Sequence, residues 1–411
     1  MPIECEFLGG GDEVGRLGIY LKKEGARMLF DYGMTASDPP KYPKPAPPID
    51  RVFLTHSHLD HCGMIPWLTA RYDIDITATR ASKMVGELLM VDSIKVAASE
   101  GYPEMYGKGE IGIASRRFSD ITFGEDTVVG STHVTAHTAG HIPGATMYEI
   151  SGKRTTLVTG DIHTTDTRLV GGAKPVKCDN LIMESTYSGR NHPNRNKTEY
   201  EFIKKVHEVV DRGGKAIVPS FAVGRSQEML LLLKDSKLEY WLDGMGKSVN
   251  SIYLDNPEYV KSIKKLRQAI SRTNEVRNYK ARARAHKGQV IVTTSGMLDG
   301  GPVLGYVEGV RSDPKSAILL TGYQVEGSNG RQLLDTGTME FQGVTEKVAC
   351  EVVKFDFSAH AGHDDLFKFA KECSPQKIVL CHGDHRELLA NDLTKEGFEV
   401  LLPKNGEKFK L

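Results

Sequence analysis

The 411-residue chain has no net charge, no long hydrophobic run and few cysteines. Its 53 Lys and Arg residues balance 53 Asp and Glu residues, so a nucleic-acid site would need a local excess of positive charge. No apolar run reaches the roughly 18 residues of a membrane-spanning helix. The first residues, MPIECEFLGGGDEVG, lack the basic-then-apolar layout of a signal peptide, so we expect no leader and a cytoplasmic protein.

The six cysteines are scattered along the chain and form no C-x-x-C pair. This spacing gives no disulfide framework, and we expect the cysteines to be small core residues of a reduced protein. The remaining composition, 39% hydrophobic and 26% charged, is that of a globular protein, and the length suits two domains.

Short apolar runs that end in polar or glycine-rich turns recur in the first half of the chain. Each predicts a strand of about four to six residues with reactive side chains just past its carboxyl end. The runs are CEFLGG, RMLFDYG, RVFLTHSH, HVTAHTAGH, TTLVTGDIH and NLIMESTY. Six prolines between Pro39 and Pro48 predict a stiff, extended loop without regular structure.

From about residue 196 the pattern changes to alternating helices and strands. NKTEYEFIKKVHEVVDRGG has helical apolar spacing and ends at a glycine pair, and the strand KAIVPSFAV precedes the helix GRSQEMLLLLKDS. This alternation predicts a second α/β unit with a mostly parallel sheet. KIVLCHGDHRE resembles the first half again, so we expect the last strand to return to the first domain and the middle to be an insertion.

The segment LTHSHLDHCGMIP places three imidazoles and one carboxylate within six positions, at His56, His58, Asp60 and His61. Crowded imidazoles repel one another once protonated, whereas a bound cation keeps them neutral. In an extended segment His56 and His58 point the same way and can hold one ion. Asp60 and His61 follow where the chain turns into a helix and can reach a second ion.

Further ligands must come from elsewhere, because a pair of zinc ions needs about seven or eight. His141, Asp161 and His382 are candidates, since each follows a predicted strand, and the two oxygens of Asp161 suit a bridge between ions. Nitrogen-rich ligation favours zinc over magnesium or calcium. By spacing alone, these three residues could equally be ordinary strand-end residues.

The pattern H-x-H-x-D-H, with a later GH and a strand-end GD, resembles the metallo-β-lactamase superfamily. MESTY at 183–187 and FSAHAG at 357–362 narrow the resemblance to the β-CASP nucleases, and PSFAVGRSQE and TSGMLDGGP look like the inserted domain of that branch. Within it, the chain is similar to the group around the endonuclease subunit of the cleavage and polyadenylation specificity factor, which includes archaeal stand-alone versions. The resemblance covers nearly the whole chain.

The resemblance implies an α/β fold: a metallo-β-lactamase αββα sandwich with an inserted β-CASP α/β domain. The expected boundaries are 1–188 for the first part of the sandwich, 189–356 for the insertion and 357–411 for the return. The resemblance also implies two Zn²⁺ ions per chain. His56, His58, His141 and Asp161 would hold the first ion, and Asp60, His61, the bridging Asp161 and His382 would hold the second. Asp31, in LFDYG, would support the ligands without binding metal.

The reaction implied is hydrolysis of RNA phosphodiesters by a metal-activated hydroxide, which leaves 3′-hydroxyl and 5′-phosphate ends. Asp60, Glu184 and His360 are the expected catalytic residues, with His360 oriented by Glu184 as the proton donor and His363 as its rival. His382 favours RNA, because related DNA nucleases have an aliphatic residue there. Endonuclease action in RNA processing or decay is favoured, with 5′-to-3′ exonuclease action as a second activity that the sequence does not decide.

Substrate contacts are less clearly marked in the sequence. Arg225, Ser295 and Arg331 lie in family-like segments of the insertion and are candidates for RNA contacts. Residues 261–287 contain ten Lys or Arg against one Glu, which suits either phosphate contacts or a solvated helix face. The expected partners are RNA, with a homodimer or other RNA-processing proteins, and no membrane.

Three rival functions share part of this pattern. A small-molecule metallohydrolase such as a lactonase or thioesterase would need neither an insertion of this length nor the Glu184–His360 pair. A di-iron protein would resemble H-x-E-x-D-H, with a carboxylate in place of His58. A catalytically silent RNA-binding scaffold should have lost ligands, and every expected ligand is present.

Overall fold

The computed structural model describes residues 3–35, 37 and 39–411, which divide into two units. Unit 1 comprises residues up to Asn191 together with Ala359–Leu411, and unit 2 comprises His192–Ser358. Within the described residues, no regular element lies between Phe30 and Arg51, where the proline-rich loop was expected.

Unit 1 contains two seven-stranded sheets, and each is antiparallel in one half and parallel in the other. The first sheet has the order β22 (Lys408–Lys410), β1 (Glu4–Gly9), β2 (Gly18–Lys23), β3 (Ala26–Phe30), β4 (Arg51–Phe53), β5 (Asp75–Ala78) and β6 (Phe118–Asp120). The second has the order β21 (Glu399–Leu401), β20 (Lys377–Cys381), β11 (Asn180–Glu184), β10 (Thr156–Val158), β9 (Thr146–Ile150), β8 (Thr132–Thr138) and β7 (Asp126–Val129).

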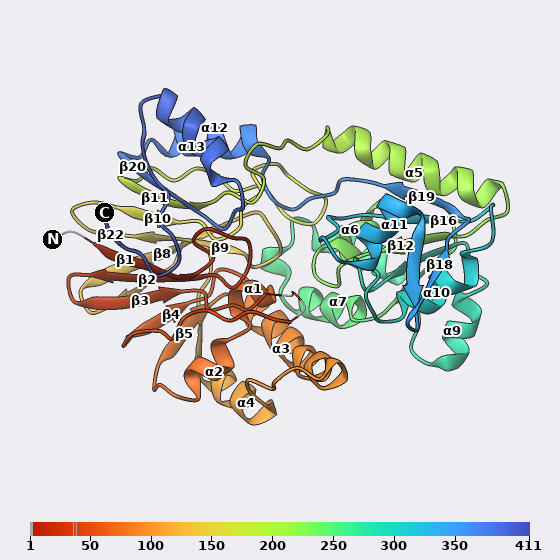
Figure 1. Ribbon diagram of the computed structural model, residues 1–411, viewed down its shortest axis with the longest axis horizontal. Helices are drawn as coiled ribbons and strands as arrows, with labels where there is room; N and C mark the ends of the chain where they lie inside the picture. The colour runs from red at the N-terminus through yellow and green to blue at the C-terminus, as the bar shows by residue number, and fades with distance from the viewer. Residues whose placement is uncertain (1–2, 36, 38) are drawn as a thin grey trace. The chain divides into compact units, whose positions relative to one another are not determined.

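Helices cover the outer face of each sheet of unit 1, which gives the αββα layers that the sequence predicts (Figure 1). The helices beside the first sheet are α1 (Leu59–Cys62), α2 (Ile65–Thr69), α3 (Arg80–Glu100) and α4 (Lys108–Arg117). Those beside the second sheet are α12 (His363–Cys373) and α13 (Arg386–Lys395). Strand β20 pairs with β11, so the end of the chain completes a sheet begun before residue 191.

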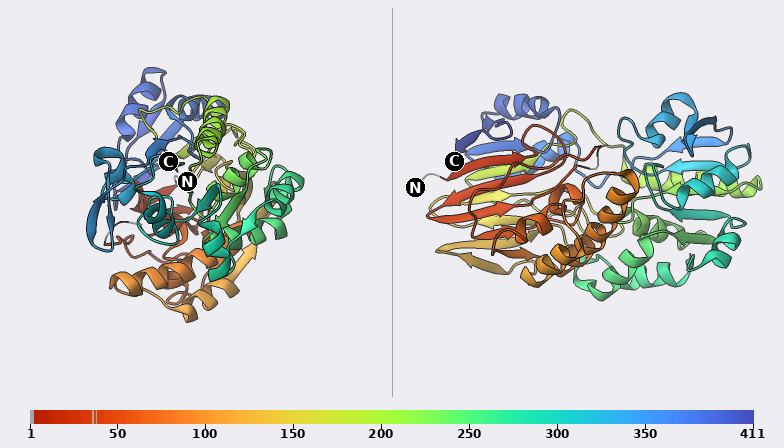
Figure 2. Two further views of the ribbon diagram at one scale, coloured as in Figure 1. Left: turned by 90° about the vertical axis from the view of Figure 1, so that its right-hand side faces the viewer. Right: turned by 60° about the horizontal axis from the view of Figure 1, so that its bottom comes forward.

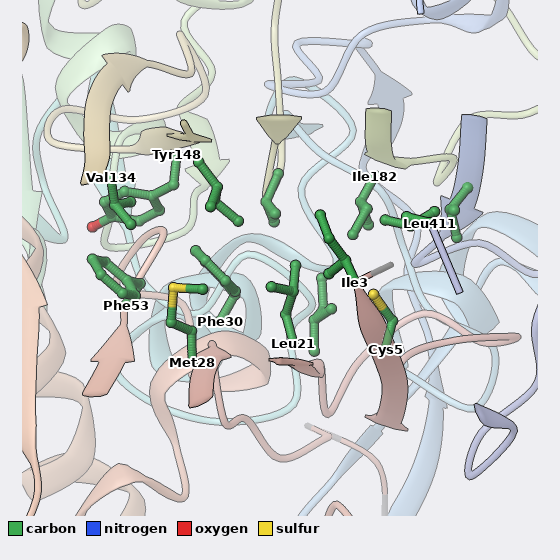
Figure 3. Close-up of a cluster of buried hydrophobic side chains, with 14 of the residues drawn as sticks. Ile3, Cys5, Leu21, Met28, Phe30, Phe53, Val134, Tyr148, Ile182 and Leu411 are labelled. Atoms are coloured by element: carbon green, nitrogen blue, oxygen red, sulfur yellow. The ribbon is translucent and has the colours of Figure 1, made fainter. Parts of the chain in front are cut away.

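The core of unit 1 lies between its two sheets, where side chains from both layers point toward one another (Figure 3). Phe30 and Phe53 stack with ring centroids 5.1 Å apart, and Tyr148 from the opposite sheet packs edge-on against Phe53. The hydroxyl of Tyr148 donates a hydrogen bond of 2.9 Å to the carbonyl of Leu54. This bond ties the second sheet to the segment that carries the crowded histidines.

Unit 2 is built on a six-stranded sheet whose paired strands all run parallel, as the alternating pattern predicts. Its order is β14 (Asn274–Glu275), β13 (Tyr240–Asp243), β15 (Val290–Thr293), β12 (Ala216–Pro219), β16 (Ala317–Leu320) and β19 (Glu351–Lys354). A separate hairpin, β17 (Thr338–Phe341) and β18 (Val344–Lys347), was not foreseen from the sequence.

Helices lie on both faces of this sheet (Figure 2). On one face a core cluster includes side chains of α9 (Tyr279–Ala285), α10 (Val303–Val310) and α11 (Asn329–Thr336). Alternate strand residues point the other way, where α5 (Arg195–Asp211), α6 (Arg225–Leu233) and α7 (Gly246–Asp255) contact the strands, and the 3₁₀ turn η1 (Pro257–Tyr259) and α8 (Ile263–Ser271) follow. α5 ends just before Gly213, which has a positive φ of 80°, at the predicted glycine pair.

Candidate metal centre

The residues that the sequence singles out lie at strand ends of unit 1. Strands β10, β11 and β20 are parallel neighbours, so their carboxyl ends meet at one sheet edge. Asp161 follows β10, Glu184 is the last residue of β11, and His382 follows β20. In the other sheet, Asp31 follows β3, and the H-x-H-x-D-H segment follows its parallel neighbour β4. The loop between β8 and β9 contributes His141.

A first group of potential ligand atoms gathers around one oxygen of Asp161. Its Oδ2 lies 3.5 Å from Nε2 of His56, 3.3 Å from Nε2 of His61 and 3.8 Å from Nε2 of His141. Nδ1 of His58 is 3.0 Å from Nε2 of His56 and 3.2 Å from Nε2 of His141. His56, His58, His141 and Asp161 can therefore each offer one atom to a common ion.

The opposite ring nitrogens of three of these histidines are engaged elsewhere. Nδ1 of His61 donates to Asp31 at 2.7 Å, Nδ1 of His141 donates to the carbonyl of Ala359 at 2.7 Å, and Nδ1 of His56 donates to Thr55 Oγ1 at 3.2 Å. These bonds place the proton on Nδ1 and leave the Nε2 lone pair directed inward, which is the tautomer a metal ligand needs.

A second group is formed by Asp60, His61 and His382, with Asp161 adjacent. Nε2 of His382 lies 3.4 Å from Oδ2 of Asp60, and its Nδ1 lies 3.5 Å from Oδ1 of Asp161. Oδ1 of Asp161 therefore faces His382, whereas Oδ2 faces both the first group and His61 of the second. Glu184 can also share a site with Asp161 and His382, a third combination that the sequence did not suggest.

Two atoms at this centre are buried without a hydrogen-bond partner among the described residues, Nε2 of His61 and Oδ1 of Asp161. A buried polar atom without a partner costs about 1–3 kcal/mol, and a cation between these atoms would satisfy both. The donor set of imidazoles and carboxylates is that of zinc and other transition-metal sites. The residues present therefore fit divalent cations.

The electrostatics of the centre agree with cation binding. Burial holds the pKa of His56 and His141 well below their usual range and lowers the pKa of His58 to about 4, so these rings are neutral ligands. Burial also opposes a proton on His61, but the charges of Asp161, Asp31 and Asp60 outweigh it and raise its pKa well above the usual value. The carboxylates thus require positive charge at this point, as protons or as metal ions.

Glu184 and His360 form the predicted pair beside the ligands. Nδ1 of His360 lies 3.1 Å from both carboxylate oxygens of Glu184, whose Oε1 also accepts the N–H of Ile162 at 2.7 Å. Nε2 of His360 faces Asp161 Oδ2 at 3.8 Å. Burial opposes a charge on His360, but Glu184 and Asp161 outweigh burial and raise its pKa to about 9.

The rival residue, His363, is engaged away from the ligands. Its Nδ1 accepts the N–H of Gly189 at 2.9 Å, and its Nε2 lies 3.2 Å from Asp392 on α13. His363 also begins helix α12. This geometry places His363 away from the cluster and leaves His360 beside Asp161.

Sequence reasoning missed three residues near the centre. The ring of Tyr187 lies 5.9 Å from that of His360, and the guanidinium of Arg190 lies 5.6 Å from the Tyr187 ring. Thr55 links Asp31 to His56 through its hydroxyl. Tyr187 is the last residue of the MESTY motif, and Thr55 directly precedes His56. Both therefore lie in or next to a motif that the sequence already singles out.

The candidate RNA contacts of unit 2 follow three different strands. Arg225 begins α6 after β12, where it is buried and lies 3.5 Å from Glu228. Ser295 follows β15 and is half-buried, and Arg331 lies on α11 after β16, paired with Asp335 at 2.7 Å. All three therefore follow the carboxyl ends of parallel strands in one sheet.

Three family models match successive parts of the chain. The metallo-beta-lactamase superfamily matches residues 14–200, the Beta-Casp domain matches 226–333, and the Zn-dependent metallo-hydrolase RNA specificity domain matches 345–403. The chain is 35% identical to "Probable RNase MJ4" of Methanocaldococcus jannaschii, a match that spans all of both chains. The chain belongs to the β-CASP branch of the metallo-β-lactamase superfamily. The fold class predicted from the sequence is thereby confirmed.

Two further relatives and one solved structure extend this comparison. "RNase aCSPSF2" of Saccharolobus solfataricus is 34% identical over 99% of this chain and 85% of its own. "Transcription termination factor FttA" of M. jannaschii is 32% identical over 94% of this chain and 68% of its own. A crystal structure of a protein of unknown function from Enterococcus faecalis shares the fold, with a TM-score of 0.66 at 16% identity over all of both chains.

Membership of this branch and the histidine–aspartate cluster together indicate a divalent-metal site. Among the described residues, all six cysteines are free and buried, as expected for small core residues. The same residues include no helix that is both long and apolar enough to cross a membrane.

Proposed function

We propose that this protein is a zinc-dependent ribonuclease that hydrolyses RNA phosphodiesters and leaves 3′-hydroxyl and 5′-phosphate ends. Endonuclease action in RNA processing or decay is the main activity, with 5′-to-3′ exonuclease action as a second. The observation that carries the proposal is the convergence of ring nitrogens on Asp161, with the Glu184–His360 pair directly beside it. Relatives of nearly the same extent carry ribonuclease names.

Two zinc ions per chain suit the two groups of ligand atoms. His56, His58, His141 and Asp161 would hold one ion, and Asp60, His61, Asp161 and His382 the other, with Asp31 supporting His61. Bound zinc supplies Lewis-acid chemistry, because it lowers the pKa of coordinated water and neutralises phosphate oxygens. Both ions can be counted by elemental analysis, which does not depend on activity.

The protein's own residues orient and protonate the reactants. Asp60, whose side chain is part-exposed, can accept a hydrogen bond and then a proton from the attacking water. As the water oxygen bonds to phosphorus, the bond from phosphorus to the 3′-oxygen breaks. Nε2 of His360 gives its proton to that leaving oxygen, while Glu184 holds Nδ1 and stabilises the charged ring.

A small-molecule hydrolase is the alternative proposal. It would use the same metal ligands, but it would not depend on His360 as an acid for an alkoxide leaving group. A parent protein that turns over an activated ester but cleaves no RNA, and whose His360→Ala variant keeps the ester turnover, would favour this alternative. Selective loss of RNA cleavage in His360→Ala, with zinc retained, would favour the ribonuclease.

The decisive experiment uses RNA labelled at either end and bearing a 5′-hydroxyl or a 5′-monophosphate. Internal fragments from both substrates indicate endonuclease action, whereas mononucleotides released only from the 5′-monophosphate form indicate 5′-to-3′ trimming. Asp161→Ala should abolish cleavage while RNA binding persists. Cleavage by this variant at the wild-type rate would refute the mechanism.

The same proposal places the enzyme in the cytoplasm, where it acts alone, as a homodimer or with other RNA-processing proteins. Light scattering of the purified protein with and without RNA separates the first two states.

A further inference from the structure

Unit 2 carries a strongly basic surface that the ligand cluster does not explain. It comprises residues 261–287, which form α8, the edge strand β14 and α9, and we name it the 261–287 surface. All ten of its Lys and Arg residues are exposed, against one Glu. The cations are Lys261, Lys264, Lys265, Arg267, Arg272, Arg277, Lys280, Arg282, Arg284 and Lys287.

This surface is basic, whereas the rest of the chain is acidic. The protein has 53 basic and 53 acidic residues, and the segment contains ten of the former and one of the latter, so the rest of the chain has a net charge of −9. A polyanion is therefore repelled, on balance, by the remainder of the protein and attracted by the 261–287 surface. The charge is separated along the chain and is not evenly mixed.

The two helices are fixed in place by their apolar sides and caps. Leu266 and Ala269 of α8 are buried, as are Ala281 and Ala285 of α9. Ser262 accepts the N–H of Lys265 at the start of α8, and Asn278 accepts the N–H of Ala281 at the start of α9. The cations occupy the solvent-facing sides of the two helices, which pack on opposite faces of the sheet and flank its edge strand β14.

Arg282 anchors α9 and is not available to a ligand. Its guanidinium donates hydrogen bonds of 2.8 and 3.2 Å to the carboxylate of Asp243, which is fully buried at the end of β13. Tyr306 on α10 donates to the same carboxylate at 3.0 Å. The charge of Arg282 thus holds the helix to the sheet while its neighbours face solvent.

Most of the other cations have no acidic neighbour. Arg272 pairs with Asp235 and Arg277 pairs with Glu275. Six cations make no ion pair with a carboxylate of the described residues: Lys264, Lys265, Arg267, Lys280, Arg284 and Lys287. Tyr279, between them, is 86% exposed and offers an aromatic face.

An ordinary solvated helix in the same unit looks different. On α5, Lys197 pairs with Glu201 and Lys204 pairs with Glu208, each four residues further along the helix. Such pairs give a face with mixed charge that carries little net field. The 261–287 surface lacks this pairing, which distinguishes it from a face that is merely soluble.

We propose that the 261–287 surface binds the phosphate backbone of RNA, as a second contact area in addition to the metal centre. This inference rests on the proposed ribonuclease function and adds a place where longer substrates are held. Lys and Arg on α8 and α9 neutralise phosphates without reading sequence, and Tyr279 stacks on a base. Substrates long enough to reach both areas bind more tightly than short ones.

The test compares two variants with the same loss of charge. The test variant combines Lys264→Gln, Arg267→Gln, Lys280→Gln and Arg284→Gln, and glutamine keeps the helices intact. The control variant combines Lys197→Gln, Lys204→Gln, Lys368→Gln and Lys395→Gln, exposed helical lysines that each have an acidic partner. Binding of a labelled polyuridine of about 30 nucleotides is measured by anisotropy in the Asp161→Ala background, at several salt concentrations.

The test variant should lose at least about tenfold in affinity, and the slope of log affinity against log salt should fall by about 0.7 for each lost contact. The control should bind as the parent does. Equal RNA affinities of the test and control variants would overturn the proposal. An acidic protein would then be the better candidate for a partner of this surface.

The cleavage of a short RNA separates this inference from the proposed function. With Asp161 restored, the test variant should cleave an RNA of about six nucleotides at the parent rate, since a substrate of this length fits one contact area. A parent protein that cleaves no RNA refutes the ribonuclease proposal, whereas a selective loss of long-RNA binding in the test variant still supports the binding surface.

Discussion

The carboxylate of Asp31 accepts a hydrogen bond from Nδ1 of His61 at 2.7 Å, with both side chains fully buried. The same carboxylate accepts the N–H and the hydroxyl of Thr55, each at 2.7 Å. Asp31 therefore fixes the tautomer of His61 and the backbone at the start of the histidine segment. A residue outside the cluster of potential ligands thus determines how the His56–His61 segment is presented.

Asp31→Asn should weaken zinc binding by about 10–100-fold, because the ring loses its charged partner. Asparagine suits this position, since Asp31 has a positive φ of 61° that asparagine tolerates. Zinc affinity is measured by competition with a chromogenic chelator. Asp50→Asn serves as the control, because Asp50 pairs with Arg27 away from the ligands. Equal affinities of both variants would contradict the supporting role.

His360→Ala should reduce kcat by about 10²–10⁴-fold, the usual contribution of a positioned acid, while the zinc content stays at the parent value. His363→Ala should leave kcat near the parent value and lower stability, since His363 binds Gly189 and Asp392. Steady-state cleavage and thermal unfolding of both variants are compared. The reverse pattern would show that the wrong histidine has been assigned.

Tyr148→Phe should lower the free energy of unfolding by about 1–3 kcal/mol, because the carbonyl of Leu54 loses a buried hydrogen bond between the two sheets. Tyr200→Phe is the matched control, because Tyr200 is 70% exposed on α5 and should be neutral. Urea unfolding gives both values. If the two variants had the same free energy of unfolding, the hydrogen bond between the sheets would contribute nothing to stability.

The stability of unit 2 should depend on the ionisation of Asp243. Burial by itself raises the pKa of Asp243, but the hydrogen bonds from Arg282, the N–H of Gly244 and Tyr306 outweigh burial and lower it below the usual value. A carboxylate with a lowered folded pKa stabilises the protein above its unfolded pKa of about 4, and this stability is lost as the pH falls through the folded pKa.

Trp67→Phe leaves Trp241, on β13, as the single fluorescent tryptophan that reports on unit 2. In this background the urea midpoint should fall as the pH drops below about 4. Asp243→Asn should start from a lower midpoint at neutral pH and lose less on acidification. Parallel pH profiles of the two proteins would exclude Asp243 as the group responsible.

Much of the fold could be predicted because its signals are local. The apolar runs before LTHSH, TGDIH and MESTY became β4, β10 and β11, and the alternating pattern after residue 196 became the parallel sheet of unit 2. The hairpin β17–β18 was missed because each strand has only four residues and β18 buries none of them, although Met339 and Phe341 of β17 are buried. The third grouping of Glu184 with Asp161 and His382 was missed because it depends on the order of strands and not on spacing.

The sequence by itself determined which donor atoms exist and how closely four of them are spaced, because His56 and His58 lie between β4 and α1, and Asp60 and His61 follow at once within α1. Only the tertiary structure decided which nitrogen of each ring points inward, and that His360 rather than His363 stands beside Asp161. The physical reason is that these choices depend on hydrogen bonds between segments far apart in the chain. Those segments meet only when the parallel strands β3 and β4 of one sheet, and β10, β11 and β20 of the other, align their carboxyl ends.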